Sequence, residues 1–200
     1  GGGRGLGGAI FHQSSSTLTI IDSTFTNNSA TGGDGGIGSA GNNGLAKANM
    51  GSGGAIFTRG TVTVTNSSLS GNTANNNSSE NAGFGGAITV IGNVSLSGST
   101  ISNNTAGIGG GIYNEVTGTL AATNSTISGN TANSTYGVGG NGGGIANLGD
   151  NNFISNGSLT VTNSTISGNT ASNFGGGISN SGIATLTNNT IALNQVTSGN

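Results

Sequence analysis

Apolar and hydroxyl-bearing residues alternate along most of the chain. The alternation is clearest in residues 61–65 (TVTVT) and 159–162 (LTVT). A period of two indicates a strand with one face buried and the other facing solvent. Glycine and asparagine interrupt the alternation on both sides, and strong helix formers are scarce. The pattern therefore predicts an all-β protein built from many short strands.

These strands belong to a repeat. The tetrapeptide Gly-Gly-(Ala/Gly)-Ile occurs six times, starting at Gly7, Gly53, Gly85, Gly109, Gly142 and Gly175. Each occurrence is followed by a block without insertions, of which residues 159–171 (LTVTNSTISGNTA) are typical. Length varies only before and after this block, and the longest insertion covers residues 31–52. Insertions at fixed points of a period are typical of a solenoid whose loops leave along one or two edges.

The repeat predicts the shape of one coil. We expect three short strands per repeat, at Gly-Gly-Ala-Ile, at Leu-Thr-Val-Thr and at Ser-Thr-Ile-Ser. The shortest period, 24 residues, suits one turn of a three-sided coil. Parallel coils stack roughly 4.8 Å apart, so six of them form a column on the order of 30 Å tall. The predicted fold is one β-solenoid domain over residues 1–200, a single-stranded parallel β-helix of about six three-sided coils with open ends.

Equivalent positions should stack, so each inward position should be apolar in every repeat. One column is isoleucine throughout: Ile10, Ile56, Ile88, Ile112, Ile145 and Ile178. Two further apolar columns are Ile20, Val64, Leu96, Ala122, Val161 and Leu186, and Phe25, Leu69, Ile101, Ile127, Ile166 and Ile191. A fourth column has small side chains, which we attribute to a turn: Ala30, Ala74, Ala106, Ala132 and Ala171, with Val196. These columns are the predicted core.

Asparagine stands three residues after the third apolar column in all six repeats: Asn28, Asn72, Asn104, Asn130, Asn169 and Asn194. Stacked amides can donate from rung to rung, and asparagine tolerates the left-handed backbone of a tight corner. We therefore predict a structural asparagine ladder here rather than a ligand-binding stripe. A second corner of the same kind is predicted at Asp22, Asn66, Gly98, Asn124, Asn163 and Asn188.

Repeats that pair Gly-Gly-Ala-Ile with Phe-x-x-Asn resemble the polymorphic outer-membrane protein repeats of chlamydiae and the bacterial surface proteins that share them. The pair is intact at residues 7–10 and 25–28, and the other repeats carry Leu or Ile at the Phe position. The resemblance implies a right-handed parallel β-helix in an extracellular or cell-surface protein. Its relatives act as autotransporter passengers, adhesins or shafts of large secreted proteins.

Charge and composition exclude several functions. Only 4% of residues are charged, with three cations against five acids and no cysteine. Three scattered cations cannot neutralise the phosphates of a nucleic acid. No run of about eighteen apolar residues is present, so no membrane-spanning helix is expected. Without cysteine there is neither a disulfide nor a thiolate metal site.

An enzyme on this fold would need clustered carboxylates with a cation near the substrate. The five carboxylates fall at scattered positions, and Arg59 and Glu115 share an edge but lie two coils apart. His12 is the only histidine, and its column is a turn position, so a structural role is expected. We predict no catalytic residue, no metal site and no cofactor.

The ends and the surface suggest the function. Terminal coils of a solenoid expose apolar side chains and strand edges, and no charged or amphipathic capping segment is evident at either end. We expect either a fragment of a longer protein or a unit that stacks end to end. The predicted function is a non-enzymatic structural protein of a bacterial surface, a shaft or filament subunit that self-associates along its axis.

Two alternatives remain open. One is a passenger-type adhesin that binds a host protein or glycan, with the aromatic residues Phe84, Tyr113, Tyr136 and Phe174 as candidate anchors. The other, a minor alternative, is an ice-binding face made of outward threonine rows such as Thr19, Thr63 and Thr160. Threonine also favours strands for its own sake, so those rows have a purely structural interpretation as well.

Overall fold

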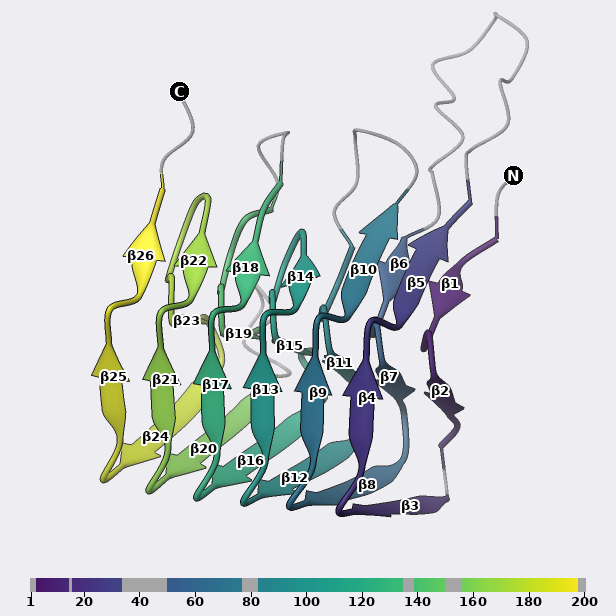
Figure 1. The fold of residues 1–200 in the computed structure, drawn as a ribbon, viewed down its shortest axis with the longest axis horizontal. Coiled ribbons are helices and arrows are strands. Elements are labelled where there is room, and N and C mark those ends of the chain that lie inside the picture. Colours follow the sequence, from purple (N-terminus) through teal and green to yellow (C-terminus); the bar gives the residue numbers. More distant parts are fainter. Residues whose placement is uncertain are drawn as a thin grey trace, which may run out of the picture.

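A computed structural model describes residues 3–14, 16–33, 50–76, 83–134, 139–149 and 156–197. Within these ranges the chain forms a right-handed parallel β-solenoid of six stacked coils and contains no helix (Figure 1). Every pairing between named strands is parallel and in register. The all-β solenoid predicted from the sequence is confirmed.

Each coil contributes one strand to each of four six-stranded parallel sheets. The first sheet contains β2 (Ile10–His12), β7 (Ile56–Thr58), β11 (Ile88–Val90), β15 (Ile112–Asn114), β19 (Ile145–Asn147) and β23 (Ile178–Asn180). The second contains β3 (Thr17–Ile21), β8 (Thr61–Thr65), β12 (Asn93–Ser97), β16 (Thr119–Thr123), β20 (Ser158–Thr162) and β24 (Ile183–Thr187). The third contains β4 (Thr24–Thr26), β9 (Ser68–Ser70), β13 (Thr100–Ser102), β17 (Thr126–Ser128), β21 (Thr165–Ser167) and β25 (Thr190–Ala192).

The fourth sheet was not expected as a sheet. It contains β5 (Ser29–Gly32), β10 (Thr73–Asn76), β14 (Thr105–Ala106), β18 (Thr131–Ala132), β22 (Thr170–Ala171) and β26 (Gln195–Val196). A fifth column begins with β1 (Gly5–Leu6) and β6 (Gly51–Ser52) and continues as single bridges through Phe84, Ile108, Asn141 and Phe174. Each coil therefore has four or five sides, where the sequence pattern predicted three.

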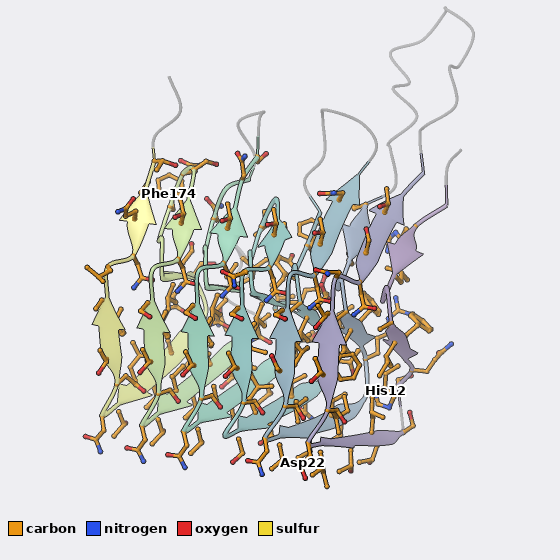
Figure 2. The ribbon with its side chains drawn as sticks, in the orientation of Figure 1. His12, Asp22 and Phe174 are labelled. Carbon is orange, nitrogen blue, oxygen red and sulfur yellow. The ribbon has the colours of Figure 1, made fainter. Side chains whose placement is uncertain are left out.

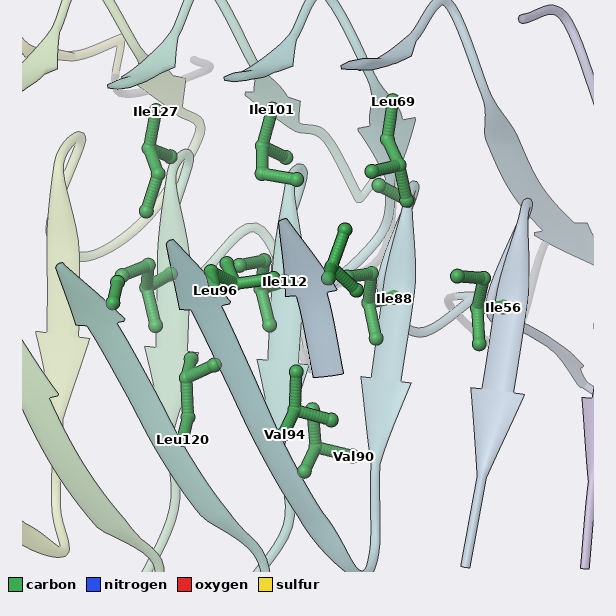
Figure 3. Close-up of a cluster of buried hydrophobic side chains, with 14 of the residues drawn as sticks. Ile56, Leu69, Ile88, Val90, Val94, Leu96, Ile101, Ile112, Leu120 and Ile127 are labelled. Carbon is green, nitrogen blue, oxygen red and sulfur yellow. The ribbon is translucent and has the colours of Figure 1, made fainter. Parts of the chain in front are cut away.

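The isoleucine column lies at the centre of the core. Ile56, Ile88, Ile112 and Ile145 are fully buried, and Ile10 and Ile178 on the two terminal coils are partly buried. Leu69, Ile101 and Ile127 of the third sheet face them across the coil (Figure 3). Stacking places each side chain on an equivalent one, so the core is a set of continuous apolar columns.

Shortening one of these isoleucines should have a modest effect. We expect Ile112→Val to lower the free energy of unfolding by about 1 kcal/mol, because one buried methyl group is lost. Urea unfolding followed by circular dichroism would measure the change. Ile21→Val is the matched control, since Ile21 is 56% exposed on β3. Equal losses in the two variants would contradict the assignment of the core.

The alanine column lies in strands of the fourth sheet, not in the predicted turn. The residue before each alanine faces the second glycine of a Gly-Gly pair, as Thr105 faces Gly86. A Cβ atom on Gly86 would overlap the carbonyl oxygen of Gly110 and lie 2.6 Å from the backbone nitrogen of Thr105. Gly54, Gly110, Gly143 and Gly176 are confined in the same way. The two backbones touch here, which leaves no room for a side chain at the second glycine of the pair.

Insertions occur at two edges of the coil. Three follow the fourth sheet, at residues 34–49, 77–82 and 135–138, and one, at 150–155, separates the first sheet from the second. The predicted insertion 31–52 is shorter than expected, because Thr31 and Gly32 belong to β5 and Gly51 and Ser52 to β6. Residues 34–49 lie outside the described ranges.

Candidate functional site

The six asparagines of the repeat form a continuous ladder. The backbone N–H and the side-chain amide of Asn72 both donate to Asn104 Oδ1, at 2.8 and 2.9 Å. Asn104 Nδ2 in turn donates to Asn130 Oδ1 at 2.9 Å and to the carbonyl oxygen of Leu69 at 3.0 Å. Equivalent bonds join every neighbouring pair from Asn28 to Asn194. The four inner asparagines are fully buried, so solvent-borne ligands do not reach them.

The left-handed residue at this corner is not the ladder asparagine. It is the residue before it, in every coil: Asn27, Gly71, Asn103, Gly129, Gly168 and Leu193. The second predicted corner does have left-handed backbone at the expected positions: Asp22, Asn66, Gly98, Asn124, Asn163 and Asn188. Asparagine thus serves two separate purposes, one of backbone conformation and one of hydrogen bonding.

A serine ladder follows the second corner and was missed in the sequence. The hydroxyl of Ser99 accepts a hydrogen bond from the backbone N–H of Ser67 at 3.2 Å, and Ser99 N–H donates to Ser125 Oγ at 3.2 Å. The series runs from Ser23 to Ser164 and ends with Asn189 on the last coil. The signal was the serine that follows the corner residue in the first five repeats.

His12 closes the corner between β2 and β3. Its Nδ1 lies 2.9 Å from Thr58 Oγ1 and its Nε2 lies 2.8 Å from Ser16 Oγ, which also donates to the carbonyl oxygen of Gln13. The side chain is buried at the N-terminal end of the solenoid, opposite the end that carries Phe174 (Figure 2). No carboxylate contacts the imidazole in this network, which joins coil 1 to coil 2.

Higher in the same column the polar stack resumes with asparagine. Asn114 Nδ2 donates to Asn147 Oδ1 at 2.6 Å, and Asn147 Nδ2 donates to Asn180 Oδ1 at 2.7 Å. Val90 occupies this position on β11 and offers no donor. The buried Oδ1 atom of Asn114 consequently has no hydrogen-bond partner in the structure.

A hollow lies on the outer surface where the fifth column meets the first sheet. Its volume is about 100 Å³, and side chains from both sides line it: Arg4, Leu6, Met50, Ser52, Phe57, Phe84, Thr89, Ile91, Tyr113 and Glu115. The glycine before this bend is left-handed in every coil, Gly53, Gly85 and Gly109 among them. Because the backbone turns inward there, outward side chains of the two flanking columns converge instead of spreading apart.

Aromatic rings form the walls of this hollow. The rings of Phe84 and Tyr113 lie 4.6 Å apart between centroids. Phe57 stacks on Phe11 at 5.5 Å, and the guanidinium of Arg59 lies 5.5 Å from the centre of the Phe57 ring. Thr89, between Phe57 and Tyr113 on the first sheet, is the smaller side chain that leaves the space open.

Charge is concentrated at the same place. Burial raises the pKa of the Glu115 carboxyl, and the nearby positive charges of Arg59 and Arg4 oppose that rise. Burial, followed by the negative charge of Glu115, raises the pKa of the Tyr113 hydroxyl above its usual range. The positive charges of Arg4 and Arg59 therefore act on the Glu115 carboxyl, and Arg4 and Glu115 both line the hollow.

The structure brings together residues that the sequence treated separately. Two of the four aromatic candidates, Phe84 and Tyr113, are in contact, and Arg59 and Glu115 act on the same site although two coils separate them. Phe174 lies apart on the last coil, 62% exposed, and Tyr136 lies outside the described residues. Phe11 and Phe57 were missed, although an aromatic residue follows the isoleucine in repeats one, two and four.

The remaining candidates do not assemble into a site. Asp22 and Glu115, the two carboxylates in the described ranges, lie at different corners of the coil. In the same ranges no three His, Asp or Glu side chains are close enough to hold a metal ion. Threonine and serine occupy outward positions of the third and fourth sheets as well as the second, so the structure singles out no one threonine face.

Comparison of the chain with protein-family models, with curated proteins and with solved structures found no match. None of the residues that the structure describes belongs to a helix with the length and hydrophobicity needed to span a membrane.

Proposed function

We propose that this protein is a non-enzymatic structural element, a β-solenoid shaft that assembles head to tail with further copies of itself. The observation that carries the proposal is the complementarity of the first and last coils that the structure describes. On coil 6, Leu186 and Ile191 occupy inward columns and are 46% and 48% exposed. A following coil would cover them, as coil 6 covers Val161 and Ile166, which are fully buried.

The hydrogen-bond ladders give the stack a direction. In each step the asparagine of one coil donates to the Oδ1 atom of the next coil. Coil 6 therefore ends with the donors of Asn194, and coil 1 begins with the acceptor Oδ1 of Asn28. The C-terminal rung of one copy matches the N-terminal rung of another in hydrogen bonding and in apolar columns. Such an interface is heterologous and propagates into a filament.

The surroundings of such a shaft are part of the same proposal. The resemblance of the Gly-Gly-Ala-Ile and Phe-x-x-Asn pair to polymorphic outer-membrane repeats supports a bacterial surface protein, located outside the cell. The near-zero net charge and the side-chain ladders that join successive coils are consistent with a rigid shaft that has a structural role. The separation of Asp22 from Glu115 supports a role without acid–base catalysis.

Substitution at the C-terminal rung tests the proposal. We expect the wild-type chain to form filaments at micromolar concentration, with a rung spacing of about 4.8 Å in electron micrographs. Leu186→Lys should raise the concentration needed for assembly at least tenfold, because it places a charge at the apolar joint. Thr185→Lys on the same strand is the matched control, since Thr185 stacks on Thr160, an outward-facing residue of β20.

Two outcomes would refute head-to-tail assembly. One is a wild-type chain that stays monomeric in sedimentation at about 100 µM, because contacts with a micromolar Kd would have associated at that concentration. The other is equal assembly of the Leu186→Lys and Thr185→Lys variants, which would mean that the terminal rung is not the joint.

A second candidate function is favoured by the aromatic hollow. A surface adhesin requires an anchor cluster at its surface. The half-buried Phe84 and the exposed Arg59 lie on the same outer face as the buried Tyr113. In this alternative the protein is a passenger-type adhesin for a host protein or glycan. A shaft with a binding face is compatible with both functions.

A further inference from the structure

The distribution of charge sets the hollow apart from the rest of the surface. The described residues contain four charged side chains, Arg4, Asp22, Arg59 and Glu115. Arg4 and Glu115 line the hollow, and Arg59 lies beside it, over the ring of the lining residue Phe57 and near enough to Glu115 to act on its carboxyl. Asp22 lies at the corner between the second and third sheets (Figure 2). With two cations and one acid, the formal charge at the hollow is 2 − 1 = +1. The rest of the outer surface of the described chain is made of neutral residues apart from Asp22.

The walls of the hollow suit part of one ring. An apolar cavity of roughly 150 Å³ holds a benzene molecule; this hollow is smaller, about 100 Å³, but it is open to solvent on one side, so a ring can enter it in part. The Phe84 and Tyr113 rings offer a surface against which a flat or saturated ring can pack. Ligand sites commonly combine such apolar walls with a few convergent polar groups.

The charged groups around the hollow determine whether it favours an anionic or a cationic ligand. No salt bridge within 4.0 Å joins Arg4 or Arg59 to an acid among the residues that the structure describes. A cationic ligand would meet two guanidiniums against one carboxylate, and Arg59 already lies over the Phe57 ring. A carboxylate is favoured instead, because guanidinium groups bind it in a planar, bidentate manner.

We propose that the hollow binds a monocyclic carboxylate, with its ring packed against Phe84 and Tyr113 and its carboxylate directed to Arg4 and Arg59. Two sources share this chemistry, an aromatic acid and a sugar acid. The Tyr113 hydroxyl and Ser52 lie in the same lining and can bond to the hydroxyl groups of a sugar. This site is independent of axial assembly, since it lies on the lateral surface.

Titration with small probes tests the site directly. Benzoate and glucuronate, added to the wild-type chain and followed by protein NMR, should each be compared with a neutral partner, methyl benzoate or methyl glucoside. We expect saturable shifts for at least one acid, with a Kd on the order of 1 mM, as suits a ligand of about ten heavy atoms. The neutral partner should bind at least tenfold more weakly. A preference for benzoate or for glucuronate identifies the source.

Two substitutions with opposite expected effects on the affinity for the acid make the test specific. Arg59→Gln should weaken binding of the preferred acid about tenfold, whereas Glu115→Gln should strengthen it several-fold by removing a like charge. Asp22→Asn changes the net charge as Glu115→Gln does, but far from the hollow, and should leave the Kd unchanged. Thermal melting of each variant would show that the fold is retained.

Three results would overturn the proposal. They are no saturable binding of either acid, equal binding of the acids and their neutral partners, and weaker binding of the acid, that is a larger Kd, in Glu115→Gln. An equal gain from Asp22→Asn and Glu115→Gln would show that net charge, and not this hollow, attracts the acid.

Discussion

Replacing Asn104 by alanine is expected to lower the free energy of unfolding by about 4 kcal/mol. The side chain takes part in four hydrogen bonds inside the solenoid, accepting two from Asn72 and donating to Asn130 and Leu69. Alanine leaves the buried N–H of Asn72 and the carbonyl of Leu69 without these partners. Each unsatisfied buried group costs roughly 1–3 kcal/mol. The substitution should therefore break the ladder on both sides of position 104, toward Asn72 and toward Asn130.

Urea unfolding monitored by circular dichroism would measure this loss. Asn93→Ala is the matched control, because Asn93 is an exposed position on β12, in the same coil as Asn104; its effect should stay within about 0.5 kcal/mol. Asn104→Leu separates hydrogen bonding from packing, since leucine fills the space but accepts no hydrogen bond. Recovery of stability in Asn104→Leu would show that volume, not the ladder, matters at this position.

Gly110→Ala is expected to destabilise the fold by about 3 kcal/mol or more, through overpacking of backbone against backbone. A Cβ atom at Gly110 would lie 2.5 Å from the carbonyl oxygen of Gly143 on the next coil and 2.5 Å from that of Thr131 across the coil. Neither atom belongs to a flexible side chain, so the strands themselves must separate. Differential scanning calorimetry would report the lowered Tm.

Gly168→Ala supplies the comparison for this effect. Gly168 has a φ of +62°, and a Cβ atom there would meet only one atom, at 4.0 Å. Its alanine variant bears the conformational cost of a left-handed residue, roughly 1–2 kcal/mol, without any clash. If Gly168→Ala were as damaging as Gly110→Ala, glycine would be required at position 110 for some reason other than space.

The fold was predictable because parallel stacking without slippage repeats each position in every coil. Ile88 pairs with Ile56 and Ile112, so a column visible in the aligned sequence is a column in space. The alternation of residues 61–65 gave the inward face directly. The same argument located the ladder asparagines. An asparagine that recurs in all six coils lies directly above another one, so the two side chains can hydrogen-bond to each other.

The shape of the coil and the hollow were not predictable on these grounds. A glycine in the sequence shows that a side chain is absent, but it does not show which atoms occupy the space. The close contact between Gly86 and Thr105 of the fourth sheet could therefore not be predicted from the sequence. The hollow joins Arg4 and Met50, which come from variable parts of the repeat, to Tyr113 three coils from Arg4. Only the inward bend at the glycines brings them together.

The positions of the insertions have a consequence for how the chain can lengthen. Successive ladder asparagines are separated by 44, 32, 26, 39 and 25 residues. Loop-closure entropy grows only with the logarithm of length, so going from 25 to 44 residues costs about 0.5 kcal/mol. That is less than a single hydrogen bond of the ladder contributes. New segments at these two edges are therefore nearly neutral to stability, and these edges are the places where peptides can be grafted while the coils beneath stay unchanged.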